Sequence, residues 1–152
     1  MLERSPASGV RVLSERSEIS RPKLVIPVVL SQSTEDRNGG ARPKPYKTLA
    51  LIDTGASISC VCTDVLAAIE ADFWEPVNVK GIGGSRDSYY HYAELQMQDN
   101  DHVSFAHISG LRVIDFLSMR DGIGMLIGMD VLSKFKEIRI QGLAMEFGEL
   151  LI

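Results

Sequence analysis

The stretch that decides the fold of this chain is LALIDTGASISC, residues 49–60. Its first four residues are apolar, which is typical of a short buried strand. The Asp-Thr-Gly that follows predicts a turn, because Gly55 tolerates backbone angles that other residues resist and because Asp and Thr side chains bond to nearby amides. Apolar residues then recur with a period of two, which predicts a second strand. The pattern therefore places one carboxylate, Asp53, at a strand-turn-strand tip, where the backbone can hold a catalytic acid.

Length and composition limit the classes of protein to consider. The chain has 152 residues, a formal net charge of −4 and 45% hydrophobic residues. It is long enough for one core and too short for two sizeable lobes. Its mild acidity argues against a nucleic-acid partner, which would require clustered Lys and Arg. No apolar run has the length of a membrane span, and the first twenty residues show no signal peptide. We therefore expect a cytoplasmic protein without nucleic-acid or membrane partners.

The rest of the sequence predicts one mostly β domain. Residues 1–23 are polar and without period, which predicts a flexible tail, and the single domain is expected over residues 24–152. Two short helices are expected, one over residues 64–71 with Thr63 as its N-cap and one ending near Phe135. The other expected strands cover residues 24–30, 77–80, 89–97, 103–108, 111–119, 123–127, 136–140 and 143–147.

A glycine-rich tip lies between the strands expected over residues 77–80 and 89–97. It reads Gly81-Ile82-Gly83-Gly84, and three glycines in four residues predict a mobile hairpin tip whose bare backbone can approach a ligand. A phosphate-binding interpretation fails, because a dinucleotide fingerprint would need a glycine at Arg86 and a helix after it.

Three segments taken together resemble the retropepsin-like (retroviral-type) aspartyl protease family. They are LIDTGAS at residues 51–57, the flap-like GIGG at residues 81–84, and LIGMDVL at residues 126–132. Each motif alone is weak, whereas the ordered set at domain-sized spacing is specific. The resemblance covers roughly residues 24–148 and implies a closed, mostly β acid-protease barrel with one or two short helices, active as a symmetric homodimer.

The chemistry of acid proteolysis independently requires two carboxyl groups. One takes a proton from the attacking water, and the other, protonated, polarises the scissile carbonyl. The chain contains a single Asp-Thr-Gly, so the simplest source of the second carboxyl is a two-fold axis through the Asp53 loop. Two charges ~4 Å apart at an effective dielectric of ~20 repel by about 4 kcal/mol, so the pair should share one proton. The sequence therefore predicts an aspartic endopeptidase that hydrolyses peptide bonds without a covalent intermediate.

The resemblance also assigns roles to individual residues. Asp53 is the catalytic acid, the Gly55 N–H should donate to its carboxylate, and Thr54 should hydrogen-bond across the two-fold axis. The residues expected to contact an extended peptide or unfolded protein substrate are Ala56, Gly81, Ile82, Gly83, Gly84 and Leu126, with Met125 as a further pocket candidate. No cofactor or metal is implied.

One feature of the retroviral enzymes is missing from this sequence. They often have an Arg after Ile-Gly that pairs with an Asp near the catalytic loop, but Met129 and Ser57 occupy those positions here. We therefore expect the dimer to depend on the C-terminal strands, through Phe147 and residues 150–152.

Several residues allow more than one interpretation. Asp130 is either a second catalytic acid or a favourable charge in the first turn of a helix. Cys60 and Cys62 lie two apart on one strand, which suits small core side chains better than a disulfide. The three histidines, His91, His102 and His107, are too scattered for a helical zinc motif, and core or surface positions suit them better than a metal site with the cysteines.

The strongest rival function is a catalytically silent dimeric module of the same fold, which would bind or scaffold peptides by strand addition. Nothing in peptide binding requires the Asp53 carboxylate, so the intact Asp-Thr-Gly argues against this alternative.

Overall fold

The computed structural model of the chain describes residues 9–14, 23–36, 40–81, 83–116 and 121–151. These residues form ten strands, two short α-helices and one 3-10 helix, η1 (Thr34–Asp36). None of the helices in these residues has the length and hydrophobicity of a membrane-spanning segment.

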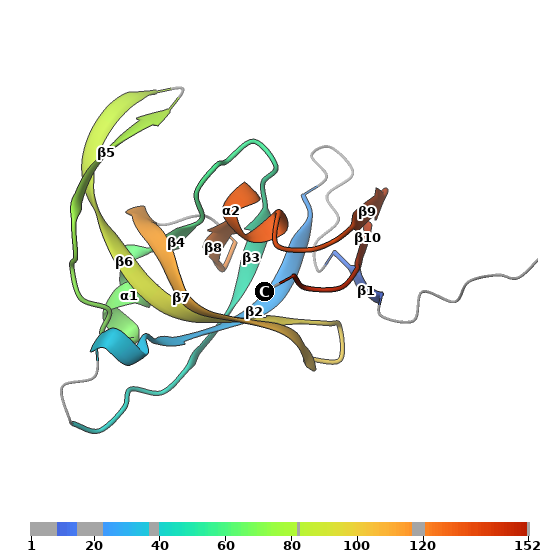
Figure 1. Cartoon of the computed structure of the whole chain (residues 1–152), viewed down its shortest axis with the longest axis horizontal. Helices are drawn as coiled ribbons and strands as arrows, with labels where there is room; N and C mark the ends of the chain where they lie inside the picture. The colour runs from blue at the N-terminus through green and yellow to red at the C-terminus, as the bar shows by residue number, and fades with distance from the viewer. Residues whose placement is uncertain (1–8, 15–22, 37–39, 82, 117–120, 152) are drawn as a thin grey trace, which may run out of the picture.

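Six strands close into a mixed barrel (Figure 1). In the order of their pairing around the barrel they are β2 (Val25–Gln32), β3 (Tyr46–Ile52), β8 (Ile123–Ile127), β4 (Cys60–Cys62), β7 (Ser104–Phe116) and β6 (Gly84–Gln98). β6 pairs back onto β2 and completes the circle. The barrel interior is apolar, and its fully buried members include Ile26, Leu30, Leu95, Met97 and Met125. The expected closed, mostly β barrel with two short helices is therefore confirmed.

The order of strands around Asp53 is not the order of the chain. β8 lies between β3 and β4, parallel to the former and antiparallel to the latter. The connection from β3 to β4, residues 53–59, must therefore cross the carboxyl end of β8. This crossing brings the Asp-Thr-Gly segment against the residues that follow β8.

The glycine-rich tip lies on a hairpin, as predicted. β5 (Pro76–Gly81) pairs with the first part of β6, and Gly81 lies opposite Gly84. Gly84 has φ of 109°, a conformation that favours glycine. The hairpin projects from the barrel at the left of Figure 1. Ile82 lies outside the described residues.

A three-stranded sheet occupies the opposite end of the molecule (Figure 1). β10 (Ala144–Phe147) is its central strand, with β1 (Val10–Leu13) on one edge and β9 (Ile138–Gln141) on the other. The expectation of a flexible tail over residues 1–23 is wrong for β1, because Val12 is fully buried and Val10 pairs with Phe147. The folded part of the chain thus includes residues before Leu24.

The same sheet changes the expectation for the dimer contacts. Both edges of β10 are hydrogen-bonded within the chain, and the Phe147 side chain is fully buried. Its ring packs 5.1 Å from the rings of Phe105 and Phe135. Phe147 is therefore a core residue rather than a contact for a second subunit, and β1 and β9 are the edge strands of this sheet among the described residues.

Both helices are shorter than predicted. α1 (Thr63–Ala68) begins one residue earlier than expected, so Cys62 rather than Thr63 occupies the N-cap. It ends before Glu70, whose φ of 53° breaks the helical path. α2 (Met129–Leu132) forms a single turn after Gly128.

Candidate active site

The Asp53 carboxylate is held by its own loop. The Asp53 N–H donates to the Ile127 carbonyl at 2.9 Å, which ties the start of the loop to the end of β8. The Gly55 N–H donates to Asp53 Oδ1 at 2.9 Å, as predicted. Asp53 is half-buried, and Thr54 and Gly55 are exposed. The structure therefore presents one acid, oriented by backbone, at the outer surface of the chain.

The far end of this loop is held by Asp130. Asp130 Oδ2 accepts the Ser59 N–H at 3.0 Å, and Oδ1 accepts the Ser59 hydroxyl at 2.7 Å. The Ser59 Oγ in turn accepts the Gly128 N–H at 3.0 Å. Asp130 lies in the first turn of α2, as the second of its two interpretations predicted. Its carboxylate positions the Asp53 loop. The only sequence feature that pointed to this contact was weak: Ser59 is a polar residue between the apolar Ile58 and Cys60.

Gly128 explains why two of the three sequence motifs occur together. The Met129 N–H donates to the Ala56 carbonyl at 2.7 Å. A Cβ atom at position 128 would lie 2.7 Å from that same oxygen and 3.1 Å from the Ile58 carbonyl group. Only glycine lets the backbone after β8 come this close to the Asp53 loop. The LIDTGAS and LIGMDVL segments are thus the two halves of one packed unit.

Asp115, at the end of β7, anchors the base of the projecting hairpin. The Arg86 guanidinium donates to the Asp115 carbonyl, and the Ser88 hydroxyl donates to the Asp115 carboxylate. The Tyr89 N–H donates to the same carboxylate at 3.4 Å. No pattern in the sequence indicated a role for Asp115. These contacts fix the hairpin to the end of β7 where it leaves the barrel.

The tip itself stands clear of the Asp53 loop in the single chain. Gly81, Gly83 and Gly84 are exposed, and a Cβ built at any of them would meet no atom within 4 Å. The structure therefore brings Asp53, Thr54, Gly55 and Ala56 together, and it does not bring the glycine tip onto them.

Comparison with solved structures identifies this architecture. The chain superposes on the crystal structure of a retropepsin-like aspartic protease from Rickettsia conorii with a TM-score of 0.58, over 97% of this chain and 96% of that one. The chain has the retropepsin-like fold. The sequence identity is 14%, so this likeness concerns the fold. The EIAV protease complexed with the inhibitor HBY-793 matches at 15% identity and a TM-score of 0.48, over 78% of this chain and 92% of that one.

Sequence comparisons add nothing to this identification. No protein-family model matches the chain, and no curated protein matches it. The retropepsin-like fold is thus established from three-dimensional structure alone.

The side chains expected to line apolar pockets differ in their placement within the retropepsin-like fold. Leu126 is half-buried on β8, between Leu51 of β3 and Cys60 of β4. Met125 is fully buried in the barrel, and its proposed pocket role is wrong because neighbouring strand residues face opposite sides of a sheet. Ala56 is half-buried in the loop.

Cys60 lies among the acids of the site. The pKa of its thiol is raised from 9.0 to about 11, and burial is the largest cause of this shift. Within this shift the positive charge of Arg86 lowers the pKa, and the negative charges of Asp130, Asp115 and Asp53 raise it. Cys60 is therefore a neutral thiol at physiological pH. Both cysteines are free thiols, and across the described ranges no group of three or more His, Cys, Asp or Glu side chains could hold a metal ion.

Proposed function

We propose that this protein is an aspartic endopeptidase that works as a symmetric homodimer. The observation that carries the proposal is the Asp53 carboxylate, half-buried at the tip of a backbone-held loop on a retropepsin-like barrel. Here one described donor, the Gly55 N–H, binds Oδ1 and leaves lone pairs of the carboxylate for substrate or water.

The chemistry needs a second copy of the chain. Two Asp53 carboxyls that meet across a two-fold axis share one proton, because ionising both costs about 4 kcal/mol at ~4 Å and an effective dielectric of ~20. The ionised member takes a proton from a water between them, and the protonated member donates to the scissile carbonyl oxygen. The water then attacks the carbonyl carbon directly. An extended peptide lies in the cleft, and the two glycine tips close over it and exclude bulk solvent.

The decisive experiment replaces Asp53 with Asn, which keeps the shape of the side chain and removes the proton chemistry. Wild type and Asp53→Asn are incubated with an unstructured-peptide library from pH 4 to 8, and products are read by mass spectrometry. We expect cleavage by the wild type only, with a rate per chain that rises with protein concentration as dimers form. Asp64→Asn, at an exposed position of α1, is the matched control and should cleave like the wild type.

Equal, slow product formation by wild type and Asp53→Asn would overturn the enzyme proposal. Peptide binding without turnover in that experiment would point instead to the silent peptide-binding module. A mass in solution that stays at one chain across the range of concentrations would remove the shared-proton mechanism, whatever the cleavage result.

A further inference from the structure

A hollow of about 230 Å³ lies between β7, α2 and the Asp53 loop. Ile58 of the loop forms one side, residues 108–112 of β7 form another, and Asp130 and Lys134 complete it from α2 and the residues after it. A water occupies ~30 Å³, so the hollow has room for a short side chain together with several waters. We call it the β7–α2 hollow.

The β7–α2 hollow carries two cations and one carboxylate. Arg112 and Lys134 are both exposed, and neither makes an ion pair with a carboxylate of the described residues. The Arg112 guanidinium lies over the Tyr90 ring, 4.3 Å from its centroid, which fixes its position through a cation–π contact. Asp130 already accepts three hydrogen bonds, from the Ser59 N–H, the Ser59 hydroxyl and the Val131 N–H. Among the described residues, the charged side chains of the hollow that keep free hydrogen-bonding capacity are therefore the cations Arg112 and Lys134.

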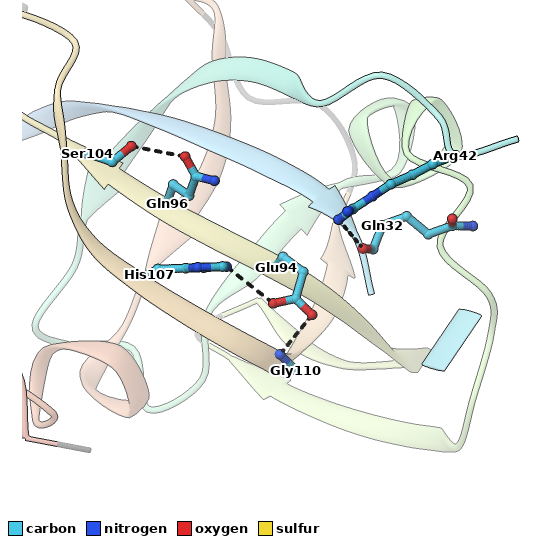
Figure 2. A network of polar contacts seen from close by, with 7 residues as sticks. All are labelled: Gln32, Arg42, Glu94, Gln96, Ser104, His107 and Gly110. Atoms are coloured by element: carbon cyan, nitrogen blue, oxygen red, sulfur yellow. Dashed lines mark hydrogen bonds and ion pairs between the residues drawn. The ribbon is translucent and has the colours of Figure 1, made fainter. Parts of the chain in front are cut away.

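The β7 wall of the hollow is pre-formed. The pairing of β6 and β7 shifts register between Ala93 and Leu95, and Gly110 in the resulting bulge has φ of 60°. Glu94, which is 5% exposed, accepts the Gly110 N–H at 3.4 Å, and its other oxygen lies 3.5 Å from His107 Nε2 (Figure 2). A buried carboxylate thus holds the bulge in place. A ligand would not have to order this wall on binding, which lowers the entropic cost.

The hollow lies within reach of a peptide bound at Asp53. Ile58, which lines the hollow, is the fifth residue after Asp53. Five extended residues span at most ~17 Å, so Ile58 lies no farther than this from Asp53. A peptide strand rises ~3.3 Å per residue. A substrate residue three to five positions from the scissile bond lies about 10–17 Å from it, a distance comparable with this upper limit for Ile58.

We propose that the β7–α2 hollow binds an acidic side chain of the peptide substrate, whose carboxylate lies between Arg112 and Lys134. This inference rests on the proposed function, because it names the substrate class of the same cleft. A two-fold dimer presents one hollow at each end of the cleft, so acidic residues are preferred on both sides of the cut at similar distances.

The test uses two pools of synthetic decapeptides with hydrophobic residues at the two central positions. One pool carries Glu three to five residues from the centre on both sides, and the other carries Gln at the same positions. Both pools compete in one reaction, so the product ratio reports the ratio of kcat/KM. We expect the wild type to prefer the Glu pool by roughly threefold to tenfold, because exposed ion pairs contribute only modest free energy. Most of this preference should disappear in 0.5 M NaCl, because salt screens exposed charges.

The variant Arg112→Gln with Lys134→Met should cleave both pools equally. The control variant Lys44→Met with Lys136→Met removes the same net charge at exposed positions outside the hollow and should keep the preference. Equal cleavage of the two pools by the wild type would overturn the proposal while leaving proteolysis intact. A preference that the Arg112→Gln, Lys134→Met variant keeps unchanged would do the same.

A binding measurement separates this proposal from the proposed function. Fluorescein-labelled Glu and Gln peptides are titrated with Asp53→Asn protein and followed by anisotropy. Tighter binding of the Glu peptide, lost in the Arg112→Gln, Lys134→Met background, supports the hollow even if the wild type cleaves nothing. Equal or undetectable binding of the two peptides contradicts it.

Discussion

Replacing Gly128 with Ala tests the packing that connects the two halves of the candidate site. Gly128 has φ of −99° and ψ of −172°, which alanine adopts without strain, so the substitution adds a methyl group and nothing else. That methyl group would lie 2.7 Å from the Ala56 carbonyl oxygen and 3.1 Å from the Ile58 carbonyl. Both neighbours are backbone atoms, so the Asp53 loop must move. Overpacking of this kind costs about 1–3 kcal/mol of unfolding free energy.

The loss should appear as a lower melting temperature. For a chain of this size, about 1–3 kcal/mol corresponds to a decrease of roughly 2–12 °C. Thermal and urea unfolding, followed by circular dichroism, measure it, and cleavage of a common peptide should also fall because the Asp53 carboxylate is displaced. Gly40→Ala is the control, because a Cβ at that position meets no atom within 4 Å. A Gly128→Ala protein as stable as Gly40→Ala would refute the close approach of the loop to the chain after β8.

Three further substitutions or modifications test other contacts. Asp130→Ala should cost about 2 kcal/mol in urea unfolding, because it leaves the Ser59 N–H and hydroxyl without their acceptor, and a cost below 0.5 kcal/mol would contradict that role. Val12→Ala should cost about 2 kcal/mol, since Val12 is fully buried in β1, whereas a flexible tail would show no change. Iodoacetamide at pH 8 should alkylate Cys60 about 100-fold more slowly than a free cysteine, because the pKa of its thiol is raised from 9.0 to about 11, chiefly by burial, and the thiolate fraction falls accordingly. Mass spectrometry measures the rate, and fast labelling of the folded protein would contradict the burial.

Local patterns in the sequence predicted the parts of the fold that depend on neighbours along the chain. Apolar alternation predicted the strands of the barrel, and the glycine-rich tip predicted the hairpin of β5 and β6. The Asp-Thr-Gly turn predicted the Gly55 donation to Asp53, which the structure shows. The catalytic role of Asp53 and the substrate contacts of the glycine tip stay predictions.

Residues far apart in the sequence account for the errors. β1 has four residues and little periodicity of its own, and it is a strand because it pairs with β10 more than 130 positions later. Phe147 was expected at a dimer contact, but the same pairing buries it among Phe105 and Phe135. Met125 and Leu126 are both apolar, and only the position of β8 inside the barrel decides which of them faces the core.

The sequence by itself determined the class of the fold, the position of Asp53 and the turn that presents it. These features depend on backbone preferences and hydrophobic periodicity, which are properties of residues close together in the chain. Only the tertiary structure decided which segments meet. By inserting β8 between β3 and β4, it packs Gly128 against Ala56, brings Asp130 to Ser59, and leaves Arg112 and Lys134 beside a hollow next to the Asp53 loop. Such contacts depend on long-range strand order, which no local pattern encodes.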